Sequence, residues 1–314
     1  MIYFTFDPRP DLKEDLLASF PEEQFVFEKS VKQPFLAEAE IIVTYGEDLT
    51  EEHIAEASQL KWIMVTSAGI EKMPKEAIAA KGIQVTNVRG IHKVPMAESV
   101  LAHILADVHA LREIYAYEEK SEWKRNIKQR ELCDATALII GPGAIGGEIG
   151  RLLQAFQVTT IGCNRSGRAA AYMDEMVTLE NIKSALPKAD FVISVIPETE
   201  ETKHLLKKEH FEMMKRSALF MNFGRGSLVE TNVLLEALTK GIIRSAVCDV
   251  FEQEPLPADH PFWALPNMTV SPHVSSHSSR YLERSFAIFK PNLKKWRAGE
   301  VATLQNIVNL SLGY

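Results

Sequence analysis

Three segments late in the chain each carry an apolar run into a loop whose side chains suit acid–base or anion-binding chemistry. Arg225 follows the run that starts at Leu219, Glu252 and Glu254 follow the run that ends near Asp249, and His273 follows Val270. An imidazole titrates near pH 6.5, which suits reversible proton transfer, and a neighbouring carboxylate stabilises its protonated form. A guanidinium stays charged and offers a planar fork of donors that matches a carboxylate. These groups therefore suit proton transfer to a bound organic acid.

A glycine-rich turn supplies the second half of the chemistry. The apolar run Ala137–Ile140 leads into a G-x-G-x-x-G pattern, and Ile145–Phe156 follows with a helical pattern. The first glycine permits a tight turn, the second lets the backbone approach a pyrophosphate, and the third lets the helix pack against the strand. The helix N-terminus then directs its free N–H groups at the phosphates. The predicted cofactor contacts at this turn are Gly141, Gly143, Ala144, Ile145 and Gly146.

The loop after the next predicted strand favours NADP over NAD. Asn164 stands 18 positions after Gly146, where an acidic residue that binds the ribose hydroxyls of NAD is expected. Asn164 does not repel a 2′-phosphate, and the adjacent basic side chains offer charge-assisted hydrogen bonds to one. A solvated basic loop that also accepts NAD is the alternative. The predicted contacts are Asn164, Arg165, Ser166 and Arg168, with Pro197 as a further candidate.

Taken together, a nicotinamide hydride, an imidazole and a guanidinium suit the reduction of a 2-keto acid. The hydride reaches the carbonyl carbon, the imidazole protonates the developing alkoxide, and the cation holds the acid group and stabilises the oxyanion.

Two blocks of alternating strands and helices position these groups, so each block predicts a parallel sheet. The first block has predicted strands Ile2–Phe6, Phe25–Phe27, Ile41–Thr44, Trp62–Val65 and Gln84–Thr86, and predicted helices Asp11–Ser19, Glu51–Ala57 and Lys75–Ala80. A long helix is predicted at Ala97–Arg112, followed by a polar connector, Glu113–Asp134. The second block has predicted strands Thr136–Ile140, Thr159–Cys163, Phe191–Val195, Leu219–Asn222, Ser245–Asp249 and Thr269–Ser271. Its predicted helices are Ile145–Phe156, Asn181–Leu186, Lys208–Met213 and Thr231–Thr239, and a last helix is predicted at Ser279–Ala298.

The predicted architecture is a two-domain α/β protein with a cleft between the domains. A Rossmann-type, doubly wound cofactor domain is expected at residues 95–280. A smaller, flavodoxin-like α/β substrate domain is expected at residues 1–94, completed by residues 281–314.

Composition excludes several classes of function. The 314 residues are 46% hydrophobic and 25% charged, with a formal net charge of −7 and no long basic run, which argues against a nucleic-acid partner. We see no apolar stretch long enough to span a bilayer. The three cysteines are scattered, which predicts neither a disulfide framework nor a metal set; we expect small buried residues in a cytoplasmic protein, and no metal.

The chain resembles the D-isomer-specific 2-hydroxyacid dehydrogenase family. The resemblance runs from Ser67 to the C-terminal helix and rests on Asn222–Val229, Asp249–Leu256 and Ser271–Val274, in this order after the glycine turn. It implies that Arg225 binds the substrate, that His273 is the general acid, and that Glu254, rather than Glu252, is the partner of His273. It further implies that Asp249 holds the nicotinamide carboxamide, that Ala68 and Gly69 bind the substrate carboxylate, and that the protein is a homodimer.

The substrate is predicted to be small and unphosphorylated. The segment Thr44–Asp48 contains two acids and no base, where phosphoglycerate dehydrogenases of the family carry basic residues, and Glu254 stands where formate dehydrogenases have Gln. Tyr45, Ile70, Met73 and Trp263 are candidates for lining the substrate pocket. Hydroxypyruvate, glyoxylate and branched 2-keto acids remain open as substrates. Two other functions also remain open: a nucleotide-gated sensor or corepressor on the same fold, and hydride abstraction from formate or phosphite.

Overall fold

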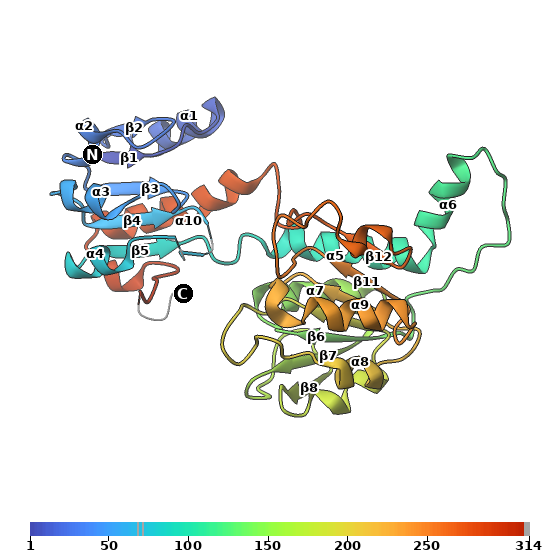
Figure 1. The fold of residues 1–314 in the computed structure, drawn as a ribbon. Helices are drawn as coiled ribbons and strands as arrows, with labels where there is room; N and C mark the ends of the chain where they lie inside the picture. The colour runs from blue at the N-terminus through green and yellow to red at the C-terminus, as the bar shows by residue number, and fades with distance from the viewer. Residues whose placement is uncertain (68, 71, 311–314) are drawn as a thin grey trace. The chain divides into compact units, whose positions relative to one another are not determined.

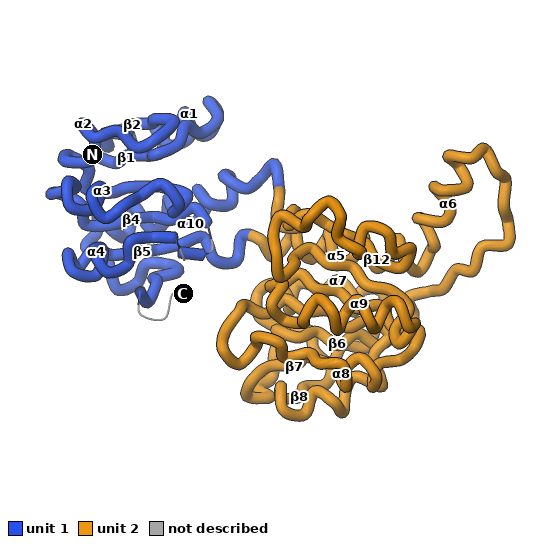
Figure 2. The backbone as a smooth tube through the Cα atoms, viewed as in Figure 1, with its two compact units in different colours: residues 1–91, 278–314 blue, residues 92–277 orange. Residues whose placement is uncertain are grey.

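The computed structural model describes residues 1–67, 69–70 and 72–310. The chain divides into two compact units, which Figure 2 shows in different colours. Unit 1 comprises Met1–Ile91 and Ser278–Tyr314, and unit 2 comprises His92–His277. Both boundaries lie three residues from the expected ones, which follow residues 94 and 280.

Unit 1 is built on a five-stranded parallel sheet with the order β2-β1-β3-β4-β5. Its strands are β1 (Ile2–Phe4), β2 (Phe25–Phe27), β3 (Ile41–Thr44), β4 (Trp62–Val65) and β5 (Gln84–Asn87). Its helices are α1 (Pro10–Ser19), α2 (Gln33–Leu36), α3 (Glu51–Glu56), α4 (Lys75–Ala80) and α10 (Tyr281–Arg297), with the short η5 (Val301–Thr303). This strand order is that of flavodoxin-like sheets, which bind ligands where the order reverses, here between β1 and β3.

Helix α10 returns to unit 1 because its aromatic face fits the aromatic face of the sheet. Phe286 and Phe289 pack edge-on against Phe4. Trp62 stacks on the ring of Phe289, with centroids 5.7 Å apart, and on that of Trp296, 5.3 Å apart. Helices α1 and α10 cover this face, whereas α2, α3 and α4 cover the other. The last helix therefore completes the core that the first strand begins.

Unit 2 is built on a seven-stranded parallel sheet with the order β12-β11-β10-β9-β6-β7-β8. Its strands are β6 (Thr136–Ile140), β7 (Thr159–Asn164), β8 (Glu175–Thr178), β9 (Phe191–Ser194), β10 (Leu219–Asn222), β11 (Ser245–Cys248) and β12 (Met268–Val270). The order reverses at β6, so the switch point lies between β6 and β9 (Figure 1). The glycine turn leaves β6 at this point.

Helices cover both faces of the second sheet. They are α5 (Lys93–Val108), α6 (Leu111–Glu118), α7 (Ala144–Ala155), α8 (Lys208–Met213) and α9 (Thr231–Thr239), with η1 (Ile182–Ser184), η2 (Leu186–Lys188), η3 (Gly226–Leu228) and η4 (Pro261–Ala264). Alternate residues of each strand face opposite sides, so Ile139 packs with α5 and α7, whereas Ile140 packs with α8 and α9.

Several predicted elements are wrong at their ends or in type. The helix predicted at Ala97–Arg112 starts earlier and ends at Val108, because Ala110 adopts a left-handed backbone (φ 52°) before α6 begins. The segment predicted as one helix at Asn181–Leu186 forms parts of two 3₁₀ turns, η1 and η2. Strand β8 and helix α2 were not predicted; both are only four residues long.

Other features concern membranes, metals and thiols. Among the described residues, no single helix is long and apolar enough to cross a membrane. Helices α5 and α6, which are bent by 67° relative to each other, have the necessary length and apolar composition only when they are taken together. In the same part of the chain, no group of three or more His, Cys, Asp or Glu side chains is arranged to hold a metal. The cysteines are free, and the expectation that all are buried is wrong because Cys133 lies at the surface.

Candidate active site

The three predicted catalytic side chains follow three neighbouring strands. Arg225 follows β10, Glu254 follows β11 and His273 follows β12, and these strands are adjacent and parallel. The carboxyl ends of parallel strands meet at one edge of a sheet, which is also the edge at which β6 enters the glycine turn. In open α/β sheets this edge borders the ligand crevice.

His273 and Glu254 form a direct pair. Nδ1 of His273 lies 2.7 Å from Oε2 of Glu254, and the side chains are 51% and 36% exposed. The other carboxylate oxygen accepts a hydrogen bond from the backbone N–H of Phe251 at 3.0 Å, which fixes the carboxylate. Pairing at Nδ1 leaves Nε2 to carry a transferable proton. The backbone of His273 is left-handed (φ 56°), a conformation that costs a non-glycine residue about 1–3 kcal/mol.

Arg225 is carried by a turn that the buried Asn222 organises. The Asn222 side chain accepts from the N–H of Gly224 at 3.1 Å and donates to the carbonyl of Arg225 at 2.9 Å. A Cβ on Gly226 would stand 1.9 Å from the backbone carbon of Phe251, so only glycine fits there. The Arg225 turn therefore packs backbone to backbone on the loop that carries Glu254, while the Arg225 residue itself is exposed.

Asp249 is buried, with 1% of its surface exposed. Its carboxylate accepts hydrogen bonds from the hydroxyls of Ser271 and Ser275 and from the backbone N–H groups of Val274 and Ser275. Burial lowers the pKa of His103 on α5, and the nearby Asp249 carboxylate offsets part of this. These contacts tie Asp249 to the loop that carries His273.

The glycine turn has the geometry that a pyrophosphate needs. A Cβ on Gly146 would stand 2.3 Å from the carbonyl oxygen of Gly141, so the third glycine closes the turn on the first. Gly141 itself has φ +94°. A Cβ on Gly143 would meet nothing within 4 Å, and no side chain caps the N-terminus of α7, whose first turn has no acidic residue. The space above Gly143 and the N–H groups of the first turn, which includes Ala144 and Ile145, therefore fit the phosphates of a dinucleotide.

The predicted ribose loop is closed by its own side chains. Asn164 donates to the carbonyl of Arg168 at 2.9 Å and accepts from the N–H of Ser166 at 3.1 Å. The Ser166 hydroxyl accepts in turn from Nε of Arg168 at 3.1 Å. Arg165 is 81% exposed and lies 3.8 Å from Glu201. Asn164 therefore shapes the loop, and the two arginines remain at its surface. Pro197 lies after β9, and its carbonyl accepts from the Thr202 hydroxyl at 2.8 Å.

The predicted substrate residues of unit 1 lie after β3 and β4. The ring of Tyr45 packs on Phe6, with centroids 4.5 Å apart, at the point where the strand order reverses. Gly69 accepts a hydrogen bond from the Ser67 hydroxyl at 2.7 Å, and Ala68 is outside the described residues. Burial raises the pKa of Tyr45.

One expectation about unit 1 needs correction. Ile70 and Met73 are 1% and 5% exposed and belong to the core of unit 1, so they do not line an open pocket. The segment Thr44–Asp48 contains no base of its own, but Lys72, from another part of unit 1, pairs with Glu47 at 3.0 Å.

A second histidine–glutamate pair lies in unit 2 and was not predicted from the sequence. Nε2 of His204 lies 3.0 Å from Oε1 of Glu252. The other Glu252 oxygen accepts from the backbone N–H and the hydroxyl of Thr231, both at 2.6 Å, at the start of α9. Sequence reasoning also missed Asn222, Ser271 and Ser275, whose signal is a polar residue at or just beyond a strand end.

Comparison with known proteins identifies the family. Residues 101–275 match the model of the D-isomer specific 2-hydroxyacid dehydrogenase, NAD binding domain. The chain belongs to this family. A glyoxylate/hydroxypyruvate reductase B from Pectobacterium carotovorum is 30% identical over 306 residues, which are 95% of this chain and 94% of the relative.

Solved structures of the family have the same fold. A D-isomer specific 2-hydroxyacid dehydrogenase family protein from Aeromonas salmonicida is 31% identical, with a TM-score of 0.84 over 98% of both chains. An NADPH-dependent glyoxylate/hydroxypyruvate reductase from Sinorhizobium meliloti, in complex with NADP and sulfate, is 25% identical, with a TM-score of 0.77 over 100% of this chain and 99% of that chain. The protein is therefore an oxidoreductase of the D-2-hydroxyacid dehydrogenase type, with a Rossmann-type cofactor domain.

Proposed function

We propose that this dehydrogenase uses NADPH to reduce a small, unphosphorylated 2-keto acid to the D-2-hydroxy acid, with hydroxypyruvate or glyoxylate as substrate. The observation that carries the proposal is the His273–Glu254 pair at 2.7 Å, which shares one sheet edge with Arg225 and the glycine turn. The names of the Pectobacterium and Sinorhizobium proteins support the same substrates.

The chain's own residues supply the proton and the charge. Bound NADPH supplies the hydride. Nε2 of His273 donates its proton to the oxygen of the reduced carbonyl, and solvent later returns that proton. Glu254 stabilises the imidazolium that precedes this transfer and holds the ring in one orientation. The Arg225 guanidinium binds the acid group and stabilises the oxyanion.

The preference for NADPH rests on the Asn164–Arg168 loop. A carboxylate at position 164 would repel a 2′-phosphate, whereas Asn164 closes the loop with its own hydrogen bonds. Arg165 and Arg168 lie at the loop surface, where guanidinium groups bind a phosphate in bidentate fashion.

Substrate contacts in unit 1 form a separate part of the proposal. We assign Gly69 and its neighbour Ala68 to the substrate carboxylate and Tyr45 to the substrate's side chain. The exposed edge of Tyr45 and the acidic groups Glu47 and Asp48 favour a substrate without a phosphate, although Lys72 offsets part of the Glu47 charge.

The proposed assembly is a homodimer formed through an arm of unit 2. Helix α6 and the loop after it project from the rest of the unit (Figure 1). None of residues 111–130 is buried, and Tyr115 and Trp123 are 55% and 92% exposed. An eight-residue helix is marginal in water on its own, and exposed aromatic side chains mark interaction surfaces. A second copy of this chain is the partner that we propose for the arm.

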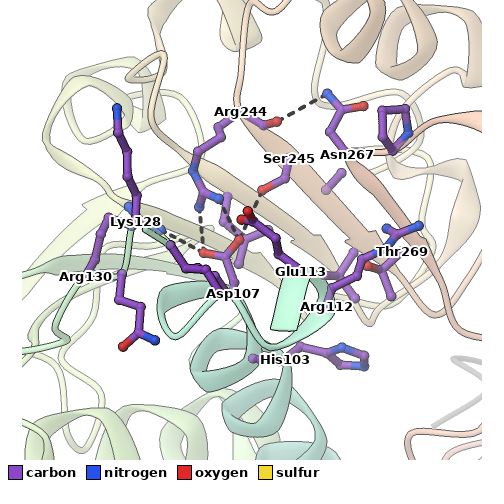
Figure 3. A pocket seen from close by; sticks show the side chains of 18 of the residues that line it. His103, Asp107, Arg112, Glu113, Lys128, Arg130, Arg244, Ser245, Asn267 and Thr269 are labelled. Carbon is purple, nitrogen blue, oxygen red and sulfur yellow. Dashed lines mark hydrogen bonds and ion pairs between the residues drawn. The ribbon is translucent and has the colours of Figure 1, made fainter. Parts of the chain in front are cut away.

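A cavity beneath the arm extends the same surface. It measures about 1030 Å³ and is lined by α5, the arm and the first residues of β10 and β11. Figure 3 shows Asp107 between Arg130 and Arg244, which it binds at 2.7 Å and 2.6 Å. This cavity lies at the amino edge of the sheet, opposite the catalytic loops, so it is separate from the catalytic site.

The proposed location is the cytoplasm, which the free cysteines support.

The decisive assay follows NADPH oxidation with a panel of 2-keto acids. We expect turnover with glyoxylate or hydroxypyruvate and none with phosphorylated acids. Tight NADPH binding without turnover of any acid would favour a nucleotide sensor instead. Reduction of NADP by formate or phosphite would instead favour hydride abstraction from one of these two anions as the reaction.

Two variants test the cofactor preference. Arg165→Ala combined with Arg168→Ala should lower the NADP to NAD ratio of kcat/KM about tenfold or more, because each charged hydrogen bond contributes about 1.5–3 kcal/mol. Lys183→Ala, which removes an exposed ion pair with Glu209, serves as the control. An unchanged ratio would reject this assignment.

Trp123→Asp tests the assembly. We expect sedimentation to show dimers for the unmodified protein and monomers for this variant. Phe156→Asp introduces the same charge at an exposed aromatic position outside the arm and should leave the dimer intact. A monomeric unmodified protein would reject the proposed dimer.

A further inference from the structure

The loop that follows β4 is held by three groups of contacts within unit 1. Toward β3, the N–H and the hydroxyl of Thr66 both donate to the carbonyl of Thr44, at 2.7 Å and 2.9 Å. After β5, the N–H of Val88 donates to the carbonyl of Ser67 at 3.3 Å. The hydroxyl of Tyr281 donates to the carbonyl of Thr66 at 2.5 Å. The first two groups join neighbouring strands of the sheet, whereas the third comes from a helix 215 positions away in the sequence.

Tyr281 is a hydrogen-bond donor on a fixed support. It is the first residue of α10, and its own carbonyl accepts from the Ser285 hydroxyl at 3.0 Å. Further along the helix, Phe286 and Phe289 are 2% and 1% exposed and pack against Phe4 of the sheet. Burial raises the pKa of the Tyr281 hydroxyl to about 12, so the hydroxyl keeps its proton at neutral pH.

This hydrogen bond fixes the orientation of a peptide group of the loop. The carbonyl of Thr66 and the N–H of Ser67 belong to one planar trans peptide, so they point in opposite directions. A rotation of this peptide would redirect the N–H of Ser67 and would withdraw the Thr66 carbonyl from the hydroxyl of Tyr281. Within the described part of the chain, no group accepts a hydrogen bond from the N–H of Ser67 or of Gly69. Tyr281 therefore limits the directions in which the loop can present its N–H groups.

The same loop is the one to which the proposed function assigns the substrate carboxylate. Gly69 lies three positions after Thr66, and its carbonyl accepts from the Ser67 hydroxyl at 2.7 Å. The carbonyl that accepts from Thr66 belongs to Thr44, the last residue of β3, which directly precedes Tyr45. The two contacts that we assign to the substrate in unit 1 therefore depend on the position of one backbone segment.

We infer that Tyr281 is a positioning residue for the substrate carboxylate, and that it acts by holding the Thr66 carbonyl and thereby the loop after β4. The inference rests on the proposed function for the role of this loop. It does not depend on which 2-keto acid is the substrate or on which nicotinamide cofactor is used. A residue of this kind contributes to the binding of the acid rather than to hydride or proton transfer, so its loss should change KM more than kcat.

The central test is Tyr281→Phe, compared with Tyr3→Phe. The first variant removes the hydroxyl and keeps the ring, so the packing of α10 is retained. Tyr3 also lies in unit 1, and its hydroxyl donates to the carbonyl of Ser30 at 3.1 Å, but its ring packs on the other face of the sheet. The control variant therefore removes a tyrosine-to-carbonyl hydrogen bond of the same unit without a change at the loop after β4.

Four readouts separate the two variants. For Tyr281→Phe we expect the KM for glyoxylate to rise about three- to tenfold, which is the usual effect of one hydrogen bond, while kcat and the NADPH dissociation constant change less than twofold. We also expect faster amide hydrogen exchange at Thr66 and Val88, whose N–H groups form the other contacts of the loop. For Tyr3→Phe we expect all four values to stay unchanged. An unchanged KM in Tyr281→Phe, or a tenfold lower kcat with the same KM, would overturn the inference.

Thr66→Val tests the contact on the side of β3. This variant removes the hydroxyl bond to Thr44 and keeps the carbonyl that accepts from Tyr281. A rise of KM in Thr66→Val without one in Tyr281→Phe would attribute the position of the loop to β3 and overturn the inference.

A binding measurement separates this inference from the proposed reaction. Titration calorimetry with oxamate, an unreactive analogue of 2-keto acids, measures the affinity of the NADPH-bound protein for the acid group without turnover. A three- to tenfold weaker affinity in Tyr281→Phe than in Tyr3→Phe would support the inference even if no 2-keto acid is reduced. Equal affinities and equal exchange at Thr66 and Val88 would overturn it even if glyoxylate is reduced.

Discussion

Unit 2 contains two histidine–glutamate pairs that differ in the ring nitrogen used: Nε2 of His204 and Nδ1 of His273. The Nδ1 of His204 also lies 3.5 Å from Glu230. Glu252 and Glu254 lie two residues apart in one loop, and their histidine partners lie at 3.0 Å and 2.7 Å. Both histidines, His204 and His273, have left-handed backbones (φ 49° and 56°). The pair distance and the backbone conformation alone therefore do not distinguish a catalytic site from a structural one.

A further difference lies in what binds the second oxygen of each carboxylate. In Glu252 it binds the N–H and hydroxyl of Thr231, at the positive end of α9, so this residue caps a helix. In Glu254 it binds one N–H of its own loop, and the His273 side chain is 51% exposed against 35% for His204. Glu252 thus connects its own loop, the start of α9 and the segment that carries His204. Glu254 pairs with a single, more accessible imidazole.

The largest expected effect is the difference in kcat between variants of the two histidines. His273→Ala should lower kcat about 10²–10⁴-fold, the usual contribution of a general acid, while NADPH affinity is retained. His204→Ala should lower kcat less than threefold. Steady-state kinetics on both variants provide the test, and equal losses would mean that the two pairs are not functionally different.

A smaller effect is expected at the two carboxylates. Glu254→Gln should lower kcat about 10–100-fold, because a charge-assisted hydrogen bond contributes about 1.5–3 kcal/mol. Its thermal unfolding should be unchanged. Glu252→Gln should leave kcat nearly unchanged and destabilise the fold by about 1 kcal/mol, as the loss of a helix cap does. Steady-state kinetics and calorimetry on both variants provide the test. A larger loss of kcat in Glu252→Gln than in Glu254→Gln would contradict these two roles.

The smallest effect concerns acid stability. Burial raises the pKa of Glu252, but hydrogen bonds from Thr231 and His204 outweigh it, and the net pKa lies below the ordinary value. A lowered carboxyl pKa contributes stability that is present above the unfolded value, near 4.5, and is lost as the pH falls through the folded value. The stability difference between the unmodified protein and Glu252→Gln should therefore shrink below about pH 4.5. A difference that stays constant down to pH 3 would contradict this role of Glu252.

The fold could be predicted where strands are apolar and continuous. The limits of Ile41–Thr44, Trp62–Val65 and Leu219–Asn222 are confirmed, because each run is fully buried on both faces. Strand β8 (Glu175–Thr178) was missed because it is short, at the sheet edge and without a buried residue. The end of α5 was misplaced because the left-handed Ala110 has no sequence signal.

The candidate site could be predicted only in part, for a related reason. Glycine spacing and strand-end residues identify the turn and the three catalytic candidates from local sequence. The residues alone did not separate Glu254 from Glu252, because the distinction depends on Thr231, about twenty positions away. The partners of Asp249 depend on a left-handed turn at His273, which spacing does not encode.

The late position of α10 has a consequence for synthesis on the ribosome. Phe286 and Phe289, which cover Phe4 and Trp62, are translated more than 200 residues after them. Unit 2 is complete in sequence by His277 and does not wait for this helix. The usual order, in which the N-terminal domain matures first, is thus reversed here, and the first sheet of the nascent chain keeps an exposed apolar face until α10 is translated.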